Sequence, residues 1–141
     1  LKHRGKAGVK ESDILMVRDG TYLVGTSCII TKYDTKILFQ SHINRLRVLK
    51  PDLLSPFLLF AILNSSIVKE QINSRKFTQN IIDTIGNRIR EILLPIPKDE
   101  KLKDKIIQET RTIVEKRAEL RHNAELISAE VIGEEDADKA S

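Results

Sequence analysis

The side chains that most often carry catalysis are few and scattered in this sequence. Its three histidines, His3, His42 and His122, are too far apart to form a metal-binding pair on one helix. The single cysteine, Cys28, has no histidine beside it that could activate it, so we expect a buried and inert thiol. A lone cysteine also excludes an internal disulfide and a cysteine-based zinc site.

Sequence motifs of catalytic and cofactor sites are missing as well. The sequence contains no Gly-x-Gly-x-x-Gly phosphate-binding motif and no Asn-Pro-Pro-aromatic motif of the kind found in adenine methyltransferases. Asp13 and Asp19 lack the Glu-x-Lys partner that the common nuclease folds place on a neighbouring strand. We therefore predict that the chain is not itself an enzyme and that it holds no cofactor or metal.

Positive charge is concentrated in the first third of the chain. Residues 1–50 contain 10 Lys and Arg against 4 Asp and Glu, whereas residues 98–141 contain 9 against 12. A basic region suits the phosphates of nucleic acid, while the acidic last third suits a protein partner better. The candidate DNA-contact residues are the basic side chains of the first third and one histidine: Lys6, Lys10, Lys32, Lys36, His42, Arg45 and Arg47.

Length and composition place the chain among soluble proteins with one domain and an appendage. It has 141 residues, of which 40% are hydrophobic and 31% are charged. Its longest apolar run, residues 53–68, is too short and too polar to cross a bilayer. No apolar stretch follows the first basic residues as it would in a signal peptide, so we expect a cytoplasmic protein without membrane contact.

The elements of the first part of the chain follow from short patterns. Residues 13–18 predict a buried strand, the pair Asp19-Gly20 predicts a hairpin turn, and residues 21–30 predict the returning strand. Within that strand Gly25 indicates a bulge or a close backbone approach. Further strands are expected at residues 36–40, 42–49 and 89–96. A helix should begin at Ser55-Pro56 and end at about residue 73. A loop is expected at residues 74–80, followed by one helical turn at residues 81–85 that Gly86 closes.

A long helix is the clearest pattern in the sequence. Asp99 is a suitable N-cap, Gly133 a suitable end, and apolar residues recur between them at alternating spacings of four and three. Such a helix is ~51 Å long, whereas a compact body of the remaining residues has a radius of gyration of only ~13 Å. Part of it should therefore project and pair with another helix. The residues expected to pair are Ile106, Ile113, Leu120, Ala124, Ile127 and Val131.

Together these elements predict an α+β fold. A small, β-rich mixed head with one or two packed helices occupies residues 1–97. A spacer and dimerisation helix, of coiled-coil type, occupies residues 98–133. Residues 134–141 form an acidic tail that we expect to be disordered.

The order of these segments resembles the specificity subunit of type I restriction-modification systems, or the related specificity portion of fused restriction-methylation enzymes. The resemblance covers residues 10–130. It depends on the segment Asp13–Thr21, on the stretch Arg90–Pro97 that ends in Pro-Ile-Pro, and on the heptad helix. Family members usually carry more of the domain before the Asp-Ile-Leu strand, so we expect the head to be N-terminally truncated.

What the resemblance implies is one target recognition domain followed by a spacer helix. Such a chain recognises double-stranded DNA without catalysis, pairs its long helix antiparallel with another helix, as in a homodimer, and docks a DNA methyltransferase subunit. Two alternatives stay open. The chain could be the C-terminal specificity region of a fused adenine methyltransferase-endonuclease, or a protein-interaction module that dimerises through its heptad helix and never touches DNA.

Overall fold

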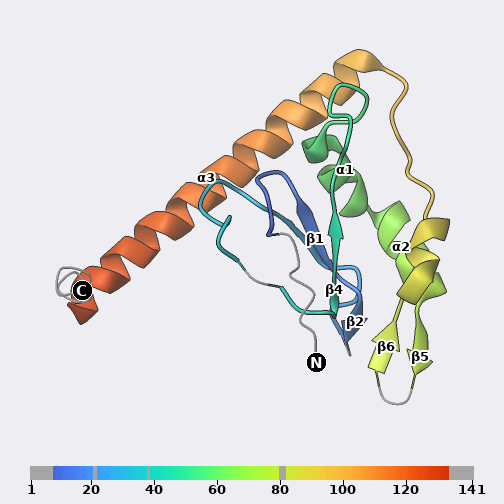
Figure 1. The fold of residues 1–141 in the computed structure, drawn as a ribbon. Helices are drawn as coiled ribbons and strands as arrows, with labels where there is room; N and C mark the ends of the chain where they lie inside the picture. The colour runs from blue at the N-terminus through green and yellow to red at the C-terminus, as the bar shows by residue number, and fades with distance from the viewer. Residues whose placement is uncertain (1–7, 21, 38, 80–81, 134–141) are drawn as a thin grey trace.

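The fold is α+β, as predicted, with a head of short strands and helices and a long C-terminal helix (Figure 1). The computed structural model describes residues 8–20, 22–37, 39–79 and 82–133. Among these residues, no helix combines the length and the apolar character needed to cross a membrane. The elements are β1 (Ile14–Val17), β2 (Asp19–Gly20), β3 (Ser27–Ile29), β4 (Ile43–Leu46), α1 (Pro56–Leu63), α2 (Ser66–Arg75), β5 (Phe77–Gln79), β6 (Ile82–Thr84), the 3-10 helix η1 (Gly86–Glu91) and α3 (Glu100–Ile132).

Two small antiparallel sheets share one extended run of chain. The first sheet has the order β3-β1-β4, and the second has the order β2-β6-β5. Arg18 separates β1 from β2 and bonds to both sheets. Its N–H donates to the carbonyl of His42 at 2.8 Å, and its carbonyl accepts from the N–H of Ile85 at 3.1 Å. Before Arg18 the chain pairs with β4, and after Arg18 it pairs with β6.

The predicted hairpin turn at Asp19-Gly20 is wrong. These two residues form β2 and pair with Thr84 and Asp83 of β6. The reversal between β1 and β3 comes later, where the N–H of Gly25 donates to the carbonyl of Val17 at 2.9 Å. The local turn preference of Asp-Gly is thus overridden by pairing with a strand more than sixty residues away. The returning strand is shorter than expected for the same reason.

The core lies between the first sheet and the helices α1 and α2. Ile14 and Met16 of β1 are fully buried and pack against apolar side chains of both helices. The other face of β1 also meets apolar side chains, since Leu15 packs with Val9 and Ile30. Apolar contacts on both faces explain why β1 is continuously apolar, and they confirm its prediction as a buried strand.

The predicted helix at residues 56–73 is two helices. Its start is confirmed, because the Ser55 hydroxyl accepts a hydrogen bond from the N–H of Phe57 and Pro56 occupies the first turn. The helix breaks at Asn64, whose side chain donates to the carbonyl of Phe60 at 2.8 Å. Ser65 then caps α2 by accepting from the N–H of Val68. Two adjacent polar side chains that bond to the backbone are the physical reason for the break.

Three other expected elements differ from the structure. The described part of residues 36–40 contains no strand, because the Asp34 carboxylate accepts from the N–H and hydroxyl of Thr31 and stabilises a succession of turns. The segments expected as a loop (74–80) and a helical turn (81–85) instead contribute β5 and β6, which pair with each other. The expected strand at residues 89–96 is η1 followed by extended chain, and Ile89 and Ile92 pack against the core from there.

The long helix α3 is confirmed from cap to cap. Asp99 accepts hydrogen bonds from the N–H groups of Lys101 and Leu102, and Gly133 ends the helix at a positive φ of 70°. The first half of α3 packs on α1, with Ala118 only 3% exposed. Figure 1 shows the second half extending beyond the head. The expected acidic tail at residues 134–141 lies outside the described residues.

Gly25 is the point where α2 meets the turn between β1 and β3. Its φ is +86°, and an added Cβ would lie 2.9 Å from Cγ2 of the buried Ile72. The close backbone approach expected from the sequence is therefore confirmed. The contact leaves no room for any side chain larger than hydrogen.

Gly25→Ala should lower the free energy of unfolding by about 1–3 kcal/mol, because it adds both backbone strain and a steric clash. Denaturant unfolding followed by circular dichroism measures the change. Gly8→Ala is the matched control, since a Cβ at Gly8 meets nothing within 4 Å. Equal stability of the two variants would contradict the packing of α2 described above.

Candidate nucleic-acid interface

Two adjoining hollows lie along β4, one of the two outer strands of the first sheet. The larger, of about 570 Å³, lies where the two sheets meet, and we call it the sheet-junction cleft. The smaller, of about 340 Å³, is lined by Arg45, Arg47 and Leu94, and both hollows include Ile89 of η1. Together they form the β4 groove. The polar residues that line the sheet-junction cleft are Arg18, Asp19, His42, Asn44, Thr84, Asn87 and Arg90.

The carboxylate of Asp19 joins three elements at the sheet-junction cleft. It accepts hydrogen bonds from Nε and Nη2 of Arg18 at 2.9 and 2.8 Å, and from the hydroxyl of Thr84. Nδ1 of His42, next to β4, lies 3.2 Å away. These contacts, the Arg18 guanidinium foremost, lower the pKa of Asp19 to about 2 despite partial desolvation. The carboxylate is therefore ionised and saturated with donors, and it holds Arg18 and His42 in place.

A second ion pair supports the other half of the groove. Asp13 is 1% exposed, and both of its oxygens accept hydrogen bonds at 2.6 Å from the forked guanidinium of Arg47. The N–H of Lys10 also donates to Asp13, at 2.8 Å. The hydrogen bonds from Arg47 outweigh burial and lower the pKa of the Asp13 carboxyl. A buried, bidentate pair of this kind gives Arg47 a structural role first.

Asn44 is the polar residue that interrupts an apolar face. It lies on the face of β4 that also carries Leu46, and its register partner is the buried Met16. Its side-chain nitrogen Nδ2 is fully buried and has no hydrogen-bond partner among the described residues. An amide donor in that state costs free energy, so its presence needs an explanation.

The 3-10 helix η1 supplies the wall opposite β4. Arg90 and Asn87 are exposed there and line the sheet-junction cleft. The guanidinium of the neighbouring Arg88 is occupied by contacts within the protein. It lies over the Phe77 ring, 5.0 Å from its centre, and donates to the carbonyl of Arg75. Among the described residues, nothing bonds to the guanidinium of Arg90. It is thus the cation of this wall that is available to a ligand.

Three of the seven predicted DNA-contact residues share the β4 groove: His42, Arg45 and Arg47. Lys10 and Lys36 are exposed outside it, and Lys6 lies outside the described residues. Whether these side chains contact DNA stays a prediction. The sequence predicts that Arg45 and Arg47 share one face of a strand. In the structure β4 ends at Leu46, so Arg47 lies beyond the strand, where it bonds to Asp13.

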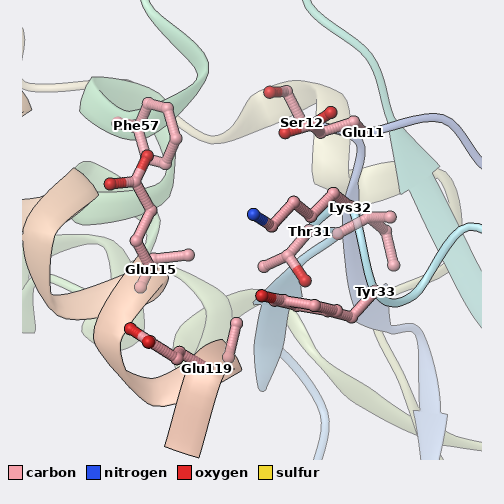
Figure 2. Close-up of a pocket in the computed structure, with 11 residues that line it drawn as sticks. Glu11, Ser12, Thr31, Lys32, Tyr33, Phe57, Glu115 and Glu119 are labelled. Atoms are coloured by element: carbon pink, nitrogen blue, oxygen red, sulfur yellow. The ribbon is translucent and has the colours of Figure 1, made fainter. Parts of the chain in front are cut away.

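Lys32 lies in a different pocket, of about 400 Å³, between the head and α3 (Figure 2). It shares this pocket with three carboxylates, those of Glu11, Glu115 and Glu119. Its ammonium also lies 5.0 Å from the centre of the Tyr33 ring. Carboxylates so close to Lys32 repel phosphate, so the β4 groove is better suited to nucleic acid than this pocket.

The predicted pairing residues of α3 fall into two groups. Ile106 packs against the core of its own head, together with Ile107 and Val114. The others are exposed, and their exposed fractions reach 69% at Leu120 and 82% at Val131. Two contacts fix the helix where it leaves the head: Arg121 bonds to Asp34 at 2.6 Å, and His122 stacks on Tyr33 at 4.5 Å. The exposed pairing residues are Ile113, Leu120, Ala124, Ile127 and Val131.

The sequence indicated only part of this site. The sequence pattern predicts a strand at residues 89–96, so it does not indicate Arg90 as part of a wall formed by η1. Asn87 lies between two predicted elements and carries no signal of its own. Asn44 could have been found, since it alternates with Leu46 and Val48 along an otherwise apolar face. Cys28, expected to be buried, is exposed because β3 is an outer strand.

Chemically, the groove offers hydrogen-bond donors that can hold a ligand. Within the described part of the chain, no group of three His, Cys, Asp or Glu side chains could bind a metal ion. Comparison of the sequence with protein-family models and with curated proteins gives no match. The function must therefore be inferred from the groove and from α3.

The depressed pKa of Asp19 predicts how stability depends on pH. Its folded value of about 2 lies below the ordinary value of 3.8, so its stabilising contribution is complete above about pH 5 and is lost as pH falls toward 2. Asp19→Asn removes that contribution. The melting temperature of the wild type should therefore fall further between pH 5 and pH 2 than that of Asp19→Asn.

The matched control is Asp52→Asn, which changes an exposed carboxylate before α1. Its acid-induced fall in melting temperature should equal that of the wild type. If Asp19→Asn also showed the wild-type fall, the Asp19 contacts would contribute nothing to the folded state.

Proposed function

We propose that this chain is a non-catalytic DNA-recognition module of a restriction-modification system. The head holds double-stranded DNA along the β4 groove, and α3 pairs with a second helix and serves a DNA methyltransferase partner. Two features support the proposal. The segment order resembles type I specificity subunits, and the α+β head with its projecting helix suits a recognition domain that carries a spacer.

The observation that carries the proposal is the set of side chains in the β4 groove. It contains four arginines, two asparagines and His42 along an outer strand. Arg and Asn are the side chains that form paired hydrogen bonds with base edges, and arginine also binds phosphate. Asp13 and Asp19 neutralise two of the arginines, so the groove is suited to specific hydrogen bonding more than to bulk electrostatic attraction.

Salt dependence tests the proposal and locates the DNA. We expect the affinity of the wild type for duplex DNA to fall with salt. The log–log slope should be reduced by about 0.9 for each phosphate contact that a variant loses. The groove pair Arg45→Gln with Arg90→Gln removes two positive charges beside the DNA and should flatten this slope, as measured by fluorescence anisotropy.

The pair Lys32→Gln with Lys36→Gln removes the same charge outside the groove and should change the slope less. A larger change for the lysine pair would place the DNA on the other side of the head. A wild-type affinity that is negligible at all salt concentrations would favour the protein-interaction alternative.

The exposed row on α3 is the observation that supports pairing. Ile113, Leu120, Ile127 and Val131 are 56%, 69%, 61% and 82% exposed along one heptad seam. The charge of the arm suits an antiparallel second copy, because residues 113–121 carry three Lys and Arg against two Glu, whereas residues 122–132 carry two Glu and no Lys or Arg. An antiparallel pair places these opposite charges side by side.

Ile113→Asp with Leu120→Asp should convert a dimer to a monomer, because pairing would bury two unpaired charges. Light scattering measures the mass, and circular dichroism verifies that the head stays folded. Leu126→Asp is the control, since Leu126 is 52% exposed but lies outside the seam. A monomeric wild type, or an equal loss of mass in the control, would contradict pairing through this seam.

A further inference from the structure

Asn44 carries an inference about what the sheet-junction cleft recognises. Its Nδ2 is buried without a partner at a position where Leu46, two residues along the same face, packs against the core. A leucine at position 44 would extend that apolar face and remove the unpaired donor. Proteins retain such locally unfavourable groups chiefly where a functional site needs them.

The surroundings of Asn44 define the missing partner. The Asp19 carboxylate is saturated by Arg18, His42 and Thr84, so it offers no acceptor to a ligand. Arg90, on the opposite wall, has donors with no partner among the described residues. The donors without a partner here, those of Asn44 and Arg90, therefore require a ligand that presents acceptors.

On the backbone and in the major groove, two parts of a DNA duplex present acceptors with neither a donor nor a methyl group beside them, namely the phosphates and the edge of guanine. Guanine exposes N7 and O6 there, whereas adenine and cytosine each expose a donor and thymine exposes a methyl group beside its single acceptor. The cleft is also lined by the ring of Phe77 and by Ile89, and Asn44 is neutral. A neutral amide and apolar walls suit a base edge better than a phosphate.

We propose that the sheet-junction cleft recognises a guanine in the DNA target, an inference that rests on the proposed function. Arg90 donates to N7 and O6 of that base through its forked guanidinium. Rotation of the Asn44 amide about its Cβ–Cγ bond, which is a soft torsion, turns Nδ2 toward the cleft to donate to the same base pair or its neighbour. Arg90 and Asn44 are then specificity-determining residues.

The test begins with selection of duplexes from a random pool by the full chain, which yields a preferred sequence. Each guanine of that sequence is then replaced in turn by 7-deazaguanine, which lacks N7 and leaves every phosphate in place. One replacement should weaken wild-type binding about tenfold or more. The same replacement should cost Arg90→Gln less than twofold, because the contact is already lost.

A methylphosphonate at the neighbouring phosphates separates the two sources of acceptors. The loss of binding affinity that the methylphosphonate causes should be the same for the wild type and for Arg90→Gln. The contrary result is that the methylphosphonate no longer weakens binding by Arg90→Gln while 7-deazaguanine still does. In that case Arg90 binds phosphate and the inference is wrong. Arg88→Gln is the matched control, and it should keep the 7-deazaguanine penalty.

Asn44→Leu tests the second residue with an independent readout. This variant should have a higher melting temperature than the wild type. It should also select duplexes with a weaker base preference at the position of the guanine or at its neighbour. A lower melting temperature with an unchanged selected sequence would mean that Asn44 is only structural. A wild type that selects a sequence in which no 7-deazaguanine replacement weakens binding contradicts this inference alone, whereas one that binds no DNA contradicts the proposed function itself.

Discussion

The carboxylate of Asp19 is the constraint on which the rest of the head depends. The run from β1 to β2 leaves one sheet and enters another at Arg18, and two strands of two or three residues hold little stability alone. Asp19 binds Arg18 beside it, His42 before β4, and Thr84 on β6. One anion thereby links the two sheets at the cleft, in addition to the backbone bonds of Arg18.

Ion pairing also explains the character of the groove. Arg18 and Arg47 are each held by a carboxylate, so their positions are set before any ligand arrives. Groups fixed in this way lose little conformational freedom on binding, which favours specificity. Arg45 and Arg90 add two further positive charges to the groove. Under the proposed function, such a groove would distinguish sequences better than it attracts DNA, and a second copy paired through α3 would raise the affinity.

Elements determined by local signals could be predicted from the sequence, and those determined by distant pairing could not. Asp99, Gly133 and the Ser55-Pro56 start act through neighbouring residues, and each is where the pattern indicated. Asp19-Gly20 has an equally strong local signal, but its role depends on Thr84 and Asp83. Residues 89–96 have the composition of a strand but pair with no strand among the described residues, and Ile89 and Ile92 pack against the core instead.

The same distinction applies to the candidate site. Positive charge in the first third pointed to His42, Arg45 and Arg47, which the fold brings into one groove. It also pointed to Lys32, which the fold places among glutamates of α3. The sequence pattern did not reveal Arg90, because only the tertiary fold places η1 opposite β4. The number of charged residues in a segment indicates which region of the chain is basic. Which side chains complete a site depends on how the fold brings distant segments together.

The central claim is that DNA lies along β4, and chemical-shift mapping tests it most directly. Labelled protein of 16.1 kDa is well suited to amide and arginine side-chain spectra during titration with a short duplex. We expect the largest shifts at residues 42–47 and 86–91, including the side-chain signals of Arg45 and Arg90. Shifts confined to residues 31–36 and the exposed part of α3, with β4 and η1 unchanged, would contradict the account.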